Sequence, residues 1–367
     1  MRMKKRPGQN AEHKHLRVGN ALRQALLGGE FKPGGVLPGE RLLAERFAVS
    51  YMTARRAIAE LVAEGLLERR GKCTLVTSDA LHIAGSVRLH LLCSQINTFS
   101  EPLLKAADEI ARKNEWITQL TIIHGNNDPF ALRAIASGDP CLLLLPPNAL
   151  LEGKIGEALR NSHGPAVIVG NSPKDDSVPW VKADDRAEMR VALDHLRELG
   201  HRSILFVHDD IKHQGLTDGL DEWMRYVREQ NPRHPRSPLC VKTESYESRP
   251  RTASQAIKRC LKNYPRPSAI ICDNDELALG VLHGLRELGV KVPGEVSVIS
   301  FGNTVLAEYA TPALSVMDVQ FERHIQVATD LILEALRGRK LSVEGHIIRP
   351  RFIPRESTAP ARVSARR

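Results

Sequence analysis

The sequence predicts two fold classes within one chain, a small α+β domain at the N-terminus and a much larger α/β domain after it. Between residues 33 and 77, two short helical patterns precede a candidate hairpin. From Val87 onward, apolar strand segments alternate with amphipathic helices, which calls for mostly parallel sheets covered by helices on both faces. This second part is about 270 residues long, too long for one doubly wound sheet, so we expect two lobes with a cleft between them.

The first 29 residues combine a basic terminal segment with a helical pattern. Residues 1–15 are rich in basic side chains without an apolar stripe, which predicts a disordered basic arm. Contact of this arm with phosphates and no role at all are equal alternatives. A helix is expected over residues 16–27, ended by Gly28 and Gly29. Its apolar positions are Val18, Leu22, Ala25 and Leu26.

Two further helices are predicted downstream, joined by a tight turn. The first spans residues 40–47, with Leu42, Leu43 and Phe47 as its packing residues. Ser50 is a good N-cap for the second helix. The apolar stripe of that helix follows helical spacing at Ala54, Ala57, Ile58, Leu61 and Val62.

A β-hairpin is predicted after the second of these helices. Residues 66–70 and 73–77 can pair across Gly71-Lys72, because glycine suits the first position of a type II′ turn. Two helices with a tight turn, followed by a basic-tipped hairpin, describe a winged helix-turn-helix. A helix that buries one side and offers arginines at its exposed start is shaped to enter a DNA major groove.

The same stretch carries a family resemblance. LPGERLLAERFAVSYMTARRAIAELVAEGLL resembles the GntR-type winged-helix pattern LPSERxLA, VSRxTVRxAL and LxxEG, and the likeness covers residues 16–77. The resemblance implies DNA contacts from the Arg of LPSER, the start of the recognition helix and the wing tip. With two further exposed positions of the helix, the candidates are Arg41, Ser50, Tyr51, Thr53, Arg55, Arg56, Gly71 and Lys72. Tyr51 replaces the usual Arg, which favours an operator unlike the commonest one.

The distribution of charge supports a DNA partner for the N-terminal part alone. The chain holds 52 Lys and Arg against 43 Asp and Glu, a net charge of +9. Residues 1–76 hold 15 of these bases against 7 acids, so the remainder is nearly neutral. A generally basic protein would spread its charge, and arginines that merely solvate a helix face would not sit within a DNA-binding pattern.

Cysteine usage and hydropathy predict a cytoplasmic protein without a membrane segment. The six cysteines are scattered without a CxxC pair, so neither zinc nor disulfides are implied and reduced thiols are expected. The basic start is not followed by an apolar core, so it is no signal peptide, and no apolar run approaches 18 residues.

No cofactor, metal or catalytic centre is predicted. His13 with His15 and His208-Asp209-Asp210 with His213 resemble metal ligands, but the first pair lies in the arm and the second in a strand-exit loop. The sequence has no GxSxG elbow, Walker loop or GxGxxG fingerprint, so an enzyme is not supported.

The α/β part divides into strand and helix segments. Strands are expected near residues 87–93, 116–123, 141–145, 166–169, 204–207, 269–272 and 296–300. A helix carrying Leu103, Leu104, Ala107, Ile110 and Ala111 on one face follows the first strand. Further helices are expected over residues 185–199, 216–229, 252–263, 275–288 and 321–336.

This part shows a second resemblance. VKADDRAEMRVALDHLRELGHRSILFV and PSAIICDNDELALG, followed by VPGEVSVISFGN and TPALSVMDVQ, resemble the LacI/GalR regulators over residues 87–355. The resemblance implies a two-lobed periplasmic-binding-protein-like fold that binds a sugar or similar small ligand between its lobes. GntR-type heads fused to such cores occur in arabinose-responsive repressors. The LacI-type head and hinge helix are absent, and residues 78–86 are expected as a linker and 357–367 as a tail.

Ligand contacts are expected at the carboxyl ends of the strands, where open α/β sheets bind ligands. The candidates are Gln95, Asn97, Phe99, Asn171, Asn274, Asp275 and Asn303. Asp275 is the strongest by resemblance, with capping of the helix from residue 275 as an almost equal alternative. Leu216 replaces the family's clamping Arg and Gly302 replaces an Asp. We therefore expect a less polar pocket, for a modified or less hydroxylated sugar or for no ligand.

Together these features predict a homodimeric transcriptional repressor that binds an operator and is controlled by a small ligand in the cleft. Three alternatives remain. One is a cytoplasmic sugar-binding protein without ligand-controlled DNA release, and another is a ligand-independent DNA-binding regulator. A catalytic α/β protein would need a nucleophile or an acid–base pair in the cleft, and none is evident.

Overall fold

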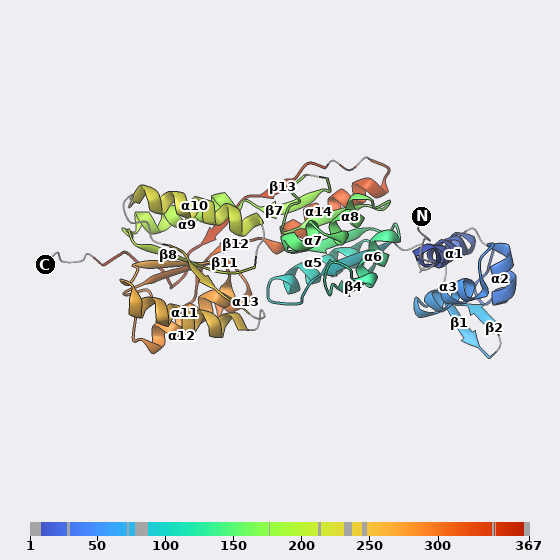
Figure 1. Ribbon diagram of the computed structural model, residues 1–367, viewed down its shortest axis with the longest axis horizontal. Coiled ribbons are helices and arrows are strands. Elements are labelled where there is room, and N and C mark those ends of the chain that lie inside the picture. The colour runs from blue at the N-terminus through green and yellow to red at the C-terminus, as the bar shows by residue number, and fades with distance from the viewer. Residues whose placement is uncertain are drawn as a thin grey trace, which may run out of the picture. The chain divides into compact units, whose positions relative to one another are not determined.

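The computed structural model describes residues 9–27, 30–71, 73–77, 87–175, 177–211, 214–230, 237–243, 248–339, 341 and 343–362. Two compact units make up the chain (Figure 1). The first, here called the head, extends to Arg88 and includes residues 115–117. The second, here called the core unit, contains Leu89–Asn114 and the chain from Thr118 onward.

The head is a winged helix-turn-helix, as predicted. Its elements are α1 (Gln9–Leu27), α2 (Glu40–Arg46), α3 (Tyr51–Ala63), β1 (Leu67–Arg70) and β2 (Cys73–Val76). The two strands pair antiparallel with Arg70 opposite Cys73, and Gly71 directly follows β1. Buried apolar residues from all three helices and both strands form one core: Val18, Leu22, Leu26, Leu37, Leu43, Ala44, Ala54, Ala57, Ile58, Leu61, Leu66, Leu67 and Val76.

Three details of the head differ from expectation. Helix α1 begins at Gln9, so the arm predicted over residues 1–15 is wrong for its second half. His15 lies inside this helix and is 1 % exposed. Leu42 is 63 % exposed, because the side of α2 that faces the core carries Leu43 and Ala44 instead. The predicted C-cap Gly28-Gly29 and the wing residue Lys72 lie outside the described residues.

The first lobe of the core unit contains a six-stranded sheet with the order β13-β7-β6-β5-β3-β4. Its strands are β3 (Arg88–Cys93), β4 (Ile117–Ile122), β5 (Cys141–Leu144), β6 (Ala166–Val169), β7 (Trp180–Ala183) and β13 (His346–Ile348). Its helices are α5 (Ser100–Lys113), α6 (Pro129–Ala136), α7 (Asn148–Leu151), α8 (Lys154–Arg160) and α14 (Phe321–Leu336). Neighbouring strands from β3 through β5, β6 and β7 to β13 run parallel.

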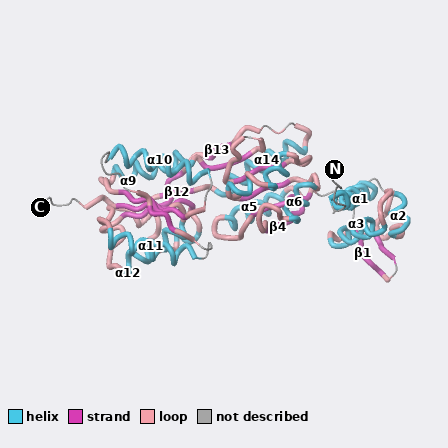
Figure 2. Tube along the Cα trace, in the orientation of Figure 1, coloured by secondary structure: helices cyan, strands magenta, loops and turns pink. Residues whose placement is uncertain are grey.

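The second lobe repeats this plan with the order β14-β12-β11-β10-β8-β9. Its strands are β8 (Ile204–Asp209), β9 (Leu239–Val241), β10 (Ala269–Cys272), β11 (Ser297–Gly302), β12 (Ser315–Asp318) and β14 (Arg351–Ile353). Its helices are α9 (Asp185–Glu198), α10 (Gln214–Gln230), α11 (Arg249–Asn263), α12 (Asp275–Glu287) and α13 (Val305–Glu308). Figure 2 shows α9 and α10 on one face of this sheet and α11 and α12 on the other. Only β14 runs antiparallel to its neighbour.

The chain passes between the two lobes three times. It leaves the first lobe after β7, returns after β12 to form α14, and leaves again between β13 and β14. The second and third passages are joined, because Gln320 Nε2 donates a hydrogen bond of 2.6 Å to the carbonyl of Arg349. The lobes are thus joined by three connecting segments, and connections of this kind can act as a hinge that permits cleft closure.

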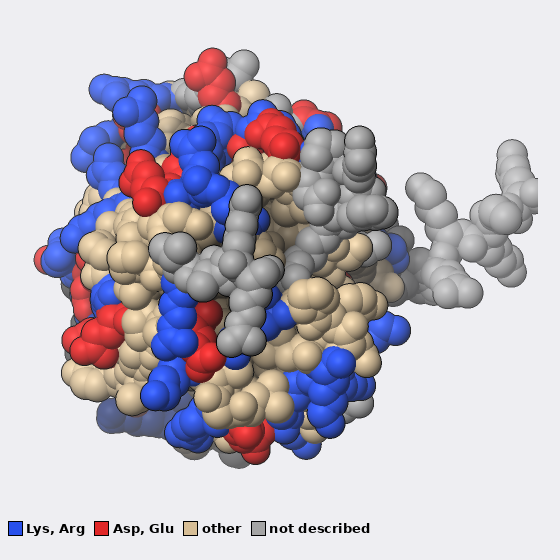
Figure 3. All heavy atoms as spheres, turned by 90° about the vertical axis from the view of Figure 1, so that its left-hand side faces the viewer, with Lys and Arg blue, Asp and Glu red and all other residues tan. Residues whose placement is uncertain are grey.

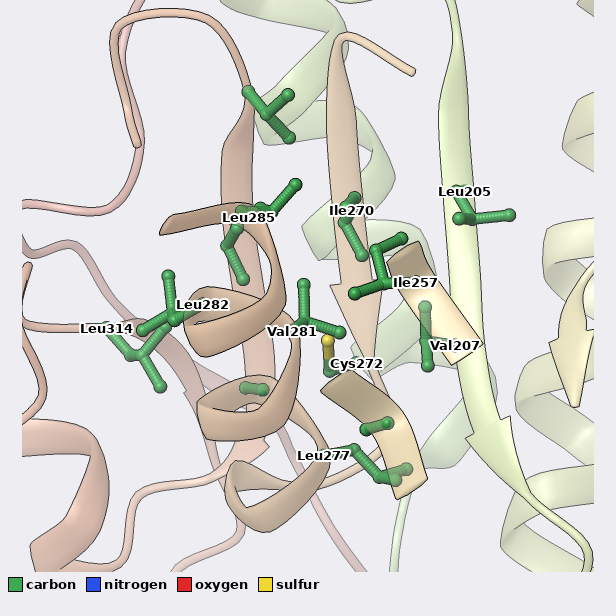
Figure 4. Close-up of a cluster of buried hydrophobic side chains, with 14 of the residues drawn as sticks. Leu205, Val207, Ile257, Ile270, Cys272, Leu277, Val281, Leu282, Leu285 and Leu314 are labelled. Atoms are coloured by element: carbon green, nitrogen blue, oxygen red, sulfur yellow. The ribbon is translucent and has the colours of Figure 1, made fainter. Parts of the chain in front are cut away.

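Each lobe has apolar cores on both faces of its sheet, which explains the continuous apolar strands. In the second lobe, one core joins β8 and β10 to α11 and α12, and Figure 4 shows Ile257, Val281 and Leu285 directed toward Ile270 of the sheet. The other core contains Phe206 and the fully buried Trp223 of α10. These cores make each lobe a rigid support for the side chains at its strand ends.

Most core-unit elements follow the predicted ranges, and five strands were not anticipated: β7, β9, β12, β13 and β14. The tail predicted over residues 357–367 is wrong for residues 357–362. Ser357 is fully buried, its hydroxyl donates to Val298 O at 2.6 Å, and Ala361 N donates to Leu199 O at 2.7 Å. The predicted linker 78–86 lies outside the described residues. Within the described chain, no helix combines the length and apolarity needed to cross a membrane.

Candidate functional site

The N-terminus of α3 is fixed by its own side chains. Ser50 caps the helix, accepting a hydrogen bond of 3.2 Å from Thr53 N, and the two hydroxyls lie 2.8 Å apart. Both residues were predicted as DNA contacts. Because both also hold the first turn in place, the structure gives them a supporting role whether or not they touch a ligand.

The predicted arginines differ in how their side chains are engaged. Arg41 and Arg55 are exposed and make no ion pair with any described residue. Arg56 is also exposed, but its Nε lies 3.5 Å from Glu60 Oε1, one turn farther along α3. Arg55 is therefore available to a partner without breaking an existing contact, whereas Arg56 is partly neutralised.

Tyr51 connects the recognition helix to the wing. A hydrogen bond to Glu40 raises the pKa of the Tyr51 phenol, and Glu40 also accepts from Arg69 of β1 at 2.9 Å. An arginine at position 51 would compete with Arg69 for the same carboxylate. Tyr51 and the wing residue Arg69 thus share the carboxylate of Glu40 in α2.

The described part of the wing turn is Gly71, since Lys72 lies outside the described residues. Gly71 has φ +61°, a backbone conformation that glycine adopts without strain, and a Cβ there would meet no atom within 4 Å. The positive φ of position 71 thus favours glycine there, and close packing does not. The turn places the exposed Arg69 and Arg70 at the tip of the hairpin.

The core unit presents a different charge pattern. Figure 3 shows basic, acidic and uncharged side chains interspersed on one face of the molecule. The sequence beyond residue 76 carries nearly equal numbers of basic and acidic residues, so most of the excess positive charge belongs to the head.

The core unit holds a cavity of about 160 Å³ between its lobes. This volume is well above the 10–15 Å³ that a single water needs, so the cavity has room for a small molecule. Four predicted ligand residues line it: Gln95, Asn97, Phe99 and Asn274. Phe99 packs edge-on against Phe321 of α14, with ring centroids 5.4 Å apart. These four residues come from strand ends in both lobes, where they were expected.

The two lining asparagines also cap helices. Asn97 Oδ1 accepts hydrogen bonds from Phe99 N and Ser100 N at 3.0 and 2.9 Å, at the start of α5. Asn274 Oδ1 accepts from Leu277 N at 2.9 Å at the start of α12. Since their oxygens are engaged, their Nδ2 groups are the atoms left to meet a ligand.

The other three predicted ligand residues do not line this cavity. Asp275 is 0 % exposed and accepts from Ser300 Oγ and, at 2.8 Å each, from the amide and hydroxyl of Thr304. Burial nevertheless raises the pKa of this carboxyl. Asn171 Nδ2 donates to Pro146 O at 2.8 Å, and Asn303 accepts from Arg355 at 2.7 Å. All three hold loops together, and their assignment as ligand contacts stays a prediction.

Several titratable cavity residues were not anticipated from the sequence: Asp185, Glu188, Arg249, Asp273 and His324. Asp185 belongs to the segment KADD, which was quoted only for its resemblance, and the strand that precedes it, β7, was not predicted. Arg249 and His324 lie within helices, and no local pattern separates them from surface residues.

Arg249 is held between two carboxylates. It donates to Glu276 Oε2 at 2.9 Å and to Asp209. Glu276 in turn accepts from Thr98 Oγ1 of the first lobe at 2.6 Å. This hydrogen bond connects the two lobes across the cleft, and its acceptor Glu276 also binds Arg249 of the cavity lining.

The opposite wall is acidic. Lys182 Nζ lies 2.9 Å from Asp185 and 2.8 Å from Asp218, and although burial opposes its charge, these carboxylates raise the pKa of Lys182. Burial, reinforced by Asp185 and Asp184 and then by Asp273 and Asp318, raises the pKa of Glu188 well above its ordinary value. These surroundings therefore favour the protonated form of Glu188 more than water does.

No group of three potential metal ligands occurs among the described residues. The ring of His208 lies with Nδ1 2.7 Å from the carbonyl of Asp209, so Nδ1 donates there. His213, the other histidine of that predicted motif, lies outside the described residues.

Known families match both parts of the chain. Residues 14–75 match the bacterial regulatory proteins of the gntR family, and residues 193–358 match the periplasmic binding protein-like domain. A LacI family transcriptional regulator from Enterococcus faecium with bound ribose has a similar fold, with a TM-score of 0.64 and 21 % identity. The similarity covers 75 % of this chain and 100 % of that one.

Two relatives that match almost the whole chain are named as repressors, and a third matches a quarter of it. The arabinose metabolism transcriptional repressor of Geobacillus stearothermophilus is 27 % identical over 94 % of this chain and 97 % of its own length. That of Halalkalibacterium halodurans is 28 % identical over 96 % and 98 %. A lactose operon repressor from Rhizobium radiobacter is 37 % identical over 25 % of this chain and 80 % of its own length. The chain thus belongs to the transcriptional regulators that join a GntR-type DNA-binding domain to a LacI-type, periplasmic-binding-protein-like domain.

Proposed function

We propose that this regulator represses transcription by binding an operator through its head, and that a small sugar or sugar-like ligand in the cleft of the core unit controls this binding. One observation carries the proposal. The same chain has an exposed recognition helix in its head and, in its core unit, a polar cavity between two lobes that three segments connect. The proposal assigns DNA binding to residues 16–77 and ligand binding with dimerisation to residues 87–356.

The head supports the DNA part of the proposal. Arg55 and Arg41 are exposed, and helix α3 buries its opposite side in the core of the head. We propose that Arg55 reads a base edge in the major groove, with Arg41 and the wing at neighbouring phosphates. Arg56, Tyr51, Thr53 and Ser50 contribute mainly by orienting this surface.

The cavity supports the ligand part. Gln95, Asn97 and Asn274 offer amide groups from both lobes, and Phe99 offers an aromatic wall. A ligand that bridges the lobes binds the closed shape more tightly than the open one, and only such a difference in affinity shifts the equilibrium. The relatives named for arabinose metabolism and the ribose-bound neighbour favour a monosaccharide-like ligand.

We further propose a homodimer. One head covers only a half-site, whereas two heads on a two-fold axis read a pseudo-palindrome with half-sites one or more helical turns apart. Sedimentation equilibrium of the full chain, with and without duplex, measures this directly. A protein that stays monomeric on its selected duplex contradicts the dimer without affecting the DNA or ligand assignments.

The decisive experiment selects a duplex from a random-sequence library with the full-length protein and then measures its affinity by fluorescence anisotropy. Arabinose, ribose, glucose and galactose, with their amino and phosphorylated forms, are added in turn. We expect at least one compound to weaken DNA binding tenfold or more, a coupling of about 1.4 kcal/mol.

Each contrary outcome points to a stated alternative. Sequence-selective DNA binding that no cleft ligand alters indicates a ligand-independent regulator. Sugar binding without enrichment of any duplex indicates a sugar-binding protein and refutes the repressor.

A further inference from the structure

Helix α9 carries a carboxyl group on its buried face. The buried residues of this helix are Glu188, Met189, Ala192, Leu193 and Leu196. Glu188 is 3 % exposed and lines the cavity between the lobes, and its Oε1 makes no hydrogen bond with any described residue. Buried polar side chains are nearly always hydrogen-bonded. An unsatisfied carboxyl oxygen in a residue of the cavity wall therefore indicates a contact that a ligand completes.

Helix α14 carries a histidine in the same situation. The buried residues of this helix are Phe321, His324, Ile325, Ala328, Thr329, Leu331 and Ile332. His324 is 2 % exposed and lines the same cavity. Its Nδ1 donates to Gln320 O at 3.1 Å, whereas its Nε2 makes no hydrogen bond with any residue that the structure describes. Each lobe thus contributes to the cavity wall one buried side chain with an unsatisfied atom.

Polar side chains at these two positions do not help folding. A buried polar atom without a partner loses its hydrogen bonds to water and gains none in return, which destabilises the folded state. Glu222 of α10 shows the ordinary arrangement of a buried carboxylate. It is 5 % exposed and accepts hydrogen bonds from Arg190 at 3.1 Å and from Arg225. Departures from this arrangement are expected mainly at functional sites, where binding is favoured at a loss of stability.

The two unsatisfied atoms differ in kind, and a hydroxyl group suits both. A carboxyl group only accepts hydrogen bonds when ionised, and one of its oxygens donates when protonated. The Nε2 of a histidine whose Nδ1 carries a proton accepts in the neutral ring and donates in the imidazolium. A hydroxyl group both donates and accepts, so it can complete either atom in each of these states. An ammonium group only donates and a carboxylate only accepts, so neither suits every state.

We propose that Glu188 and His324 are effector-binding residues, and that each forms a hydrogen bond with its own hydroxyl group of a neutral, polyhydroxylated ligand. This inference rests on the proposed function, because it names contact residues and the ligand class of the same cleft. Helix α9 belongs to the second lobe and α14 to the first. The two contacts together therefore hold the lobes in their ligand-bound arrangement.

The first test needs no ligand. Glu188→Met replaces the carboxyl group by an apolar side chain of similar length. Because this removes an unsatisfied buried atom, the thermal unfolding midpoint of the sugar-free, full-length protein should rise by roughly 2 °C or more. Glu222→Met is the matched control, since it removes a buried carboxylate that is hydrogen-bonded, and its midpoint should fall. An unchanged or lowered midpoint for Glu188→Met shows a structural role and overturns the inference.

The second test measures sugar affinity by isothermal titration calorimetry on the full-length protein. Arabinose, ribose, glucose and galactose are titrated together with the monodeoxy analogues of each. Glu188→Met and His324→Phe should each weaken binding of the tightest sugar roughly tenfold or more. Asp194→Asn, at a side chain of α9 that is 49 % exposed, should leave the affinity unchanged.

The deoxy analogues identify the hydroxyl group that each residue binds. One analogue should bind the wild type roughly tenfold more weakly than its parent sugar, yet bind Glu188→Met as tightly as the parent does, because that contact is already lost. A different analogue should show the same relation with His324→Phe. This comparison also corrects for the Nδ1 hydrogen bond that His324→Phe loses, since that loss affects the parent sugar and its analogue equally.

DNA release is measured in parallel, which separates this inference from the proposed function. If either variant binds the tightest sugar as well as the wild type does, if no analogue shows the matched loss, or if no sugar of the panel binds, the inference is overturned. The proposed function survives that result when another compound still releases the duplex. If both variants lose affinity as expected but the sugar leaves the DNA affinity of the wild type unchanged, the contacts stand and the repressor proposal falls.

Discussion

Replacing Arg55 by alanine gives the sharpest view of how the head recognises DNA. The side chain is exposed and makes no ion pair with a described residue, so its removal leaves the fold intact, with a stability change within about 0.5 kcal/mol. A bidentate arginine–guanine contact discriminates by about 1–3 kcal/mol. The expected loss of operator affinity is therefore roughly 5- to 150-fold at fixed salt, at about 1.4 kcal/mol per tenfold.

Arg56→Ala is the matched control, because it removes the same charge from the next residue of α3. Arg56 is held by Glu60 at 3.5 Å, and such exposed helix pairs are worth only about 0.3–0.5 kcal/mol. We expect less than about threefold loss of affinity for this variant, since its charge is partly compensated before DNA arrives.

Fluorescence anisotropy on the selected duplex, at two salt concentrations and with single-base substitutions in each half-site, separates the possible roles. A base contact predicts that Arg55→Ala loses discrimination at one base pair, whereas a phosphate contact lowers affinity evenly and reduces the salt slope by about one. Equal losses from both variants would show that only net charge matters. Wild-type affinity for Arg55→Ala removes this residue from the interface.

Three further predictions follow from the core unit. The pKa of Glu188 is higher in the folded state than in the unfolded chain, so the free energy of unfolding falls as pH rises from the ordinary pKa of glutamic acid to the raised one. Glu188→Gln should flatten this pH dependence in urea unfolding between about pH 4.5 and 8. An unchanged slope would contradict the raised pKa of Glu188. Thr98→Val removes the 2.6 Å hydrogen bond to Glu276 that joins the lobes. Such a charge-assisted bond is worth about 1.5–3 kcal/mol, so the effector affinity measured by calorimetry should fall roughly tenfold or more. Unchanged affinity would mean that closure of the cleft between the lobes does not use this contact. A chain ending at Glu356 loses the buried Ser357 and the four hydrogen bonds that this residue makes. At about 1 kcal/mol for each bond, the free energy of unfolding measured in urea should fall by about 4 kcal/mol, whereas an unchanged value restores the shorter domain boundary.

The fold was largely predictable, because its elements carry their own signals. The stripe from Ala54 to Leu61 is buried as a helix face, and the apolar runs 141–144, 166–169 and 269–272 are central strands. Strands buried on both faces read as continuous apolar segments. A short sequence window was therefore sufficient to find them.

The three passages between lobes were not predictable in the same way. Strands β13 and β14 have three residues each and lie next to one another in the chain, yet they belong to different sheets. Their partners, β7 and β12, lie far upstream. Nothing local in such short segments indicates which sheet they join, because that choice depends on distant pairing.

The candidate site was predicted only in part, for a physical reason. Strand-exit position brought Gln95 and Asn274 to the cavity correctly, but it could not tell which of two adjacent residues faces the ligand. Asn274 lines the cavity while Asp275 turns inward to Ser300 and Thr304. Glu188 and His324 lie on the faces of long helices, where a buried polar residue and an exposed one look alike in sequence.

The central claim is that DNA binding by the head and effector binding in the cleft are coupled. The most direct test is whether each ligand changes the affinity of the other by the same factor. The effector's dissociation constant is measured by calorimetry on the full-length protein, alone and saturated with its selected duplex. If the cleft controls the head, the duplex must weaken effector binding by the same factor by which the effector weakens duplex binding, tenfold or more. Identical effector affinities with and without DNA would contradict the account.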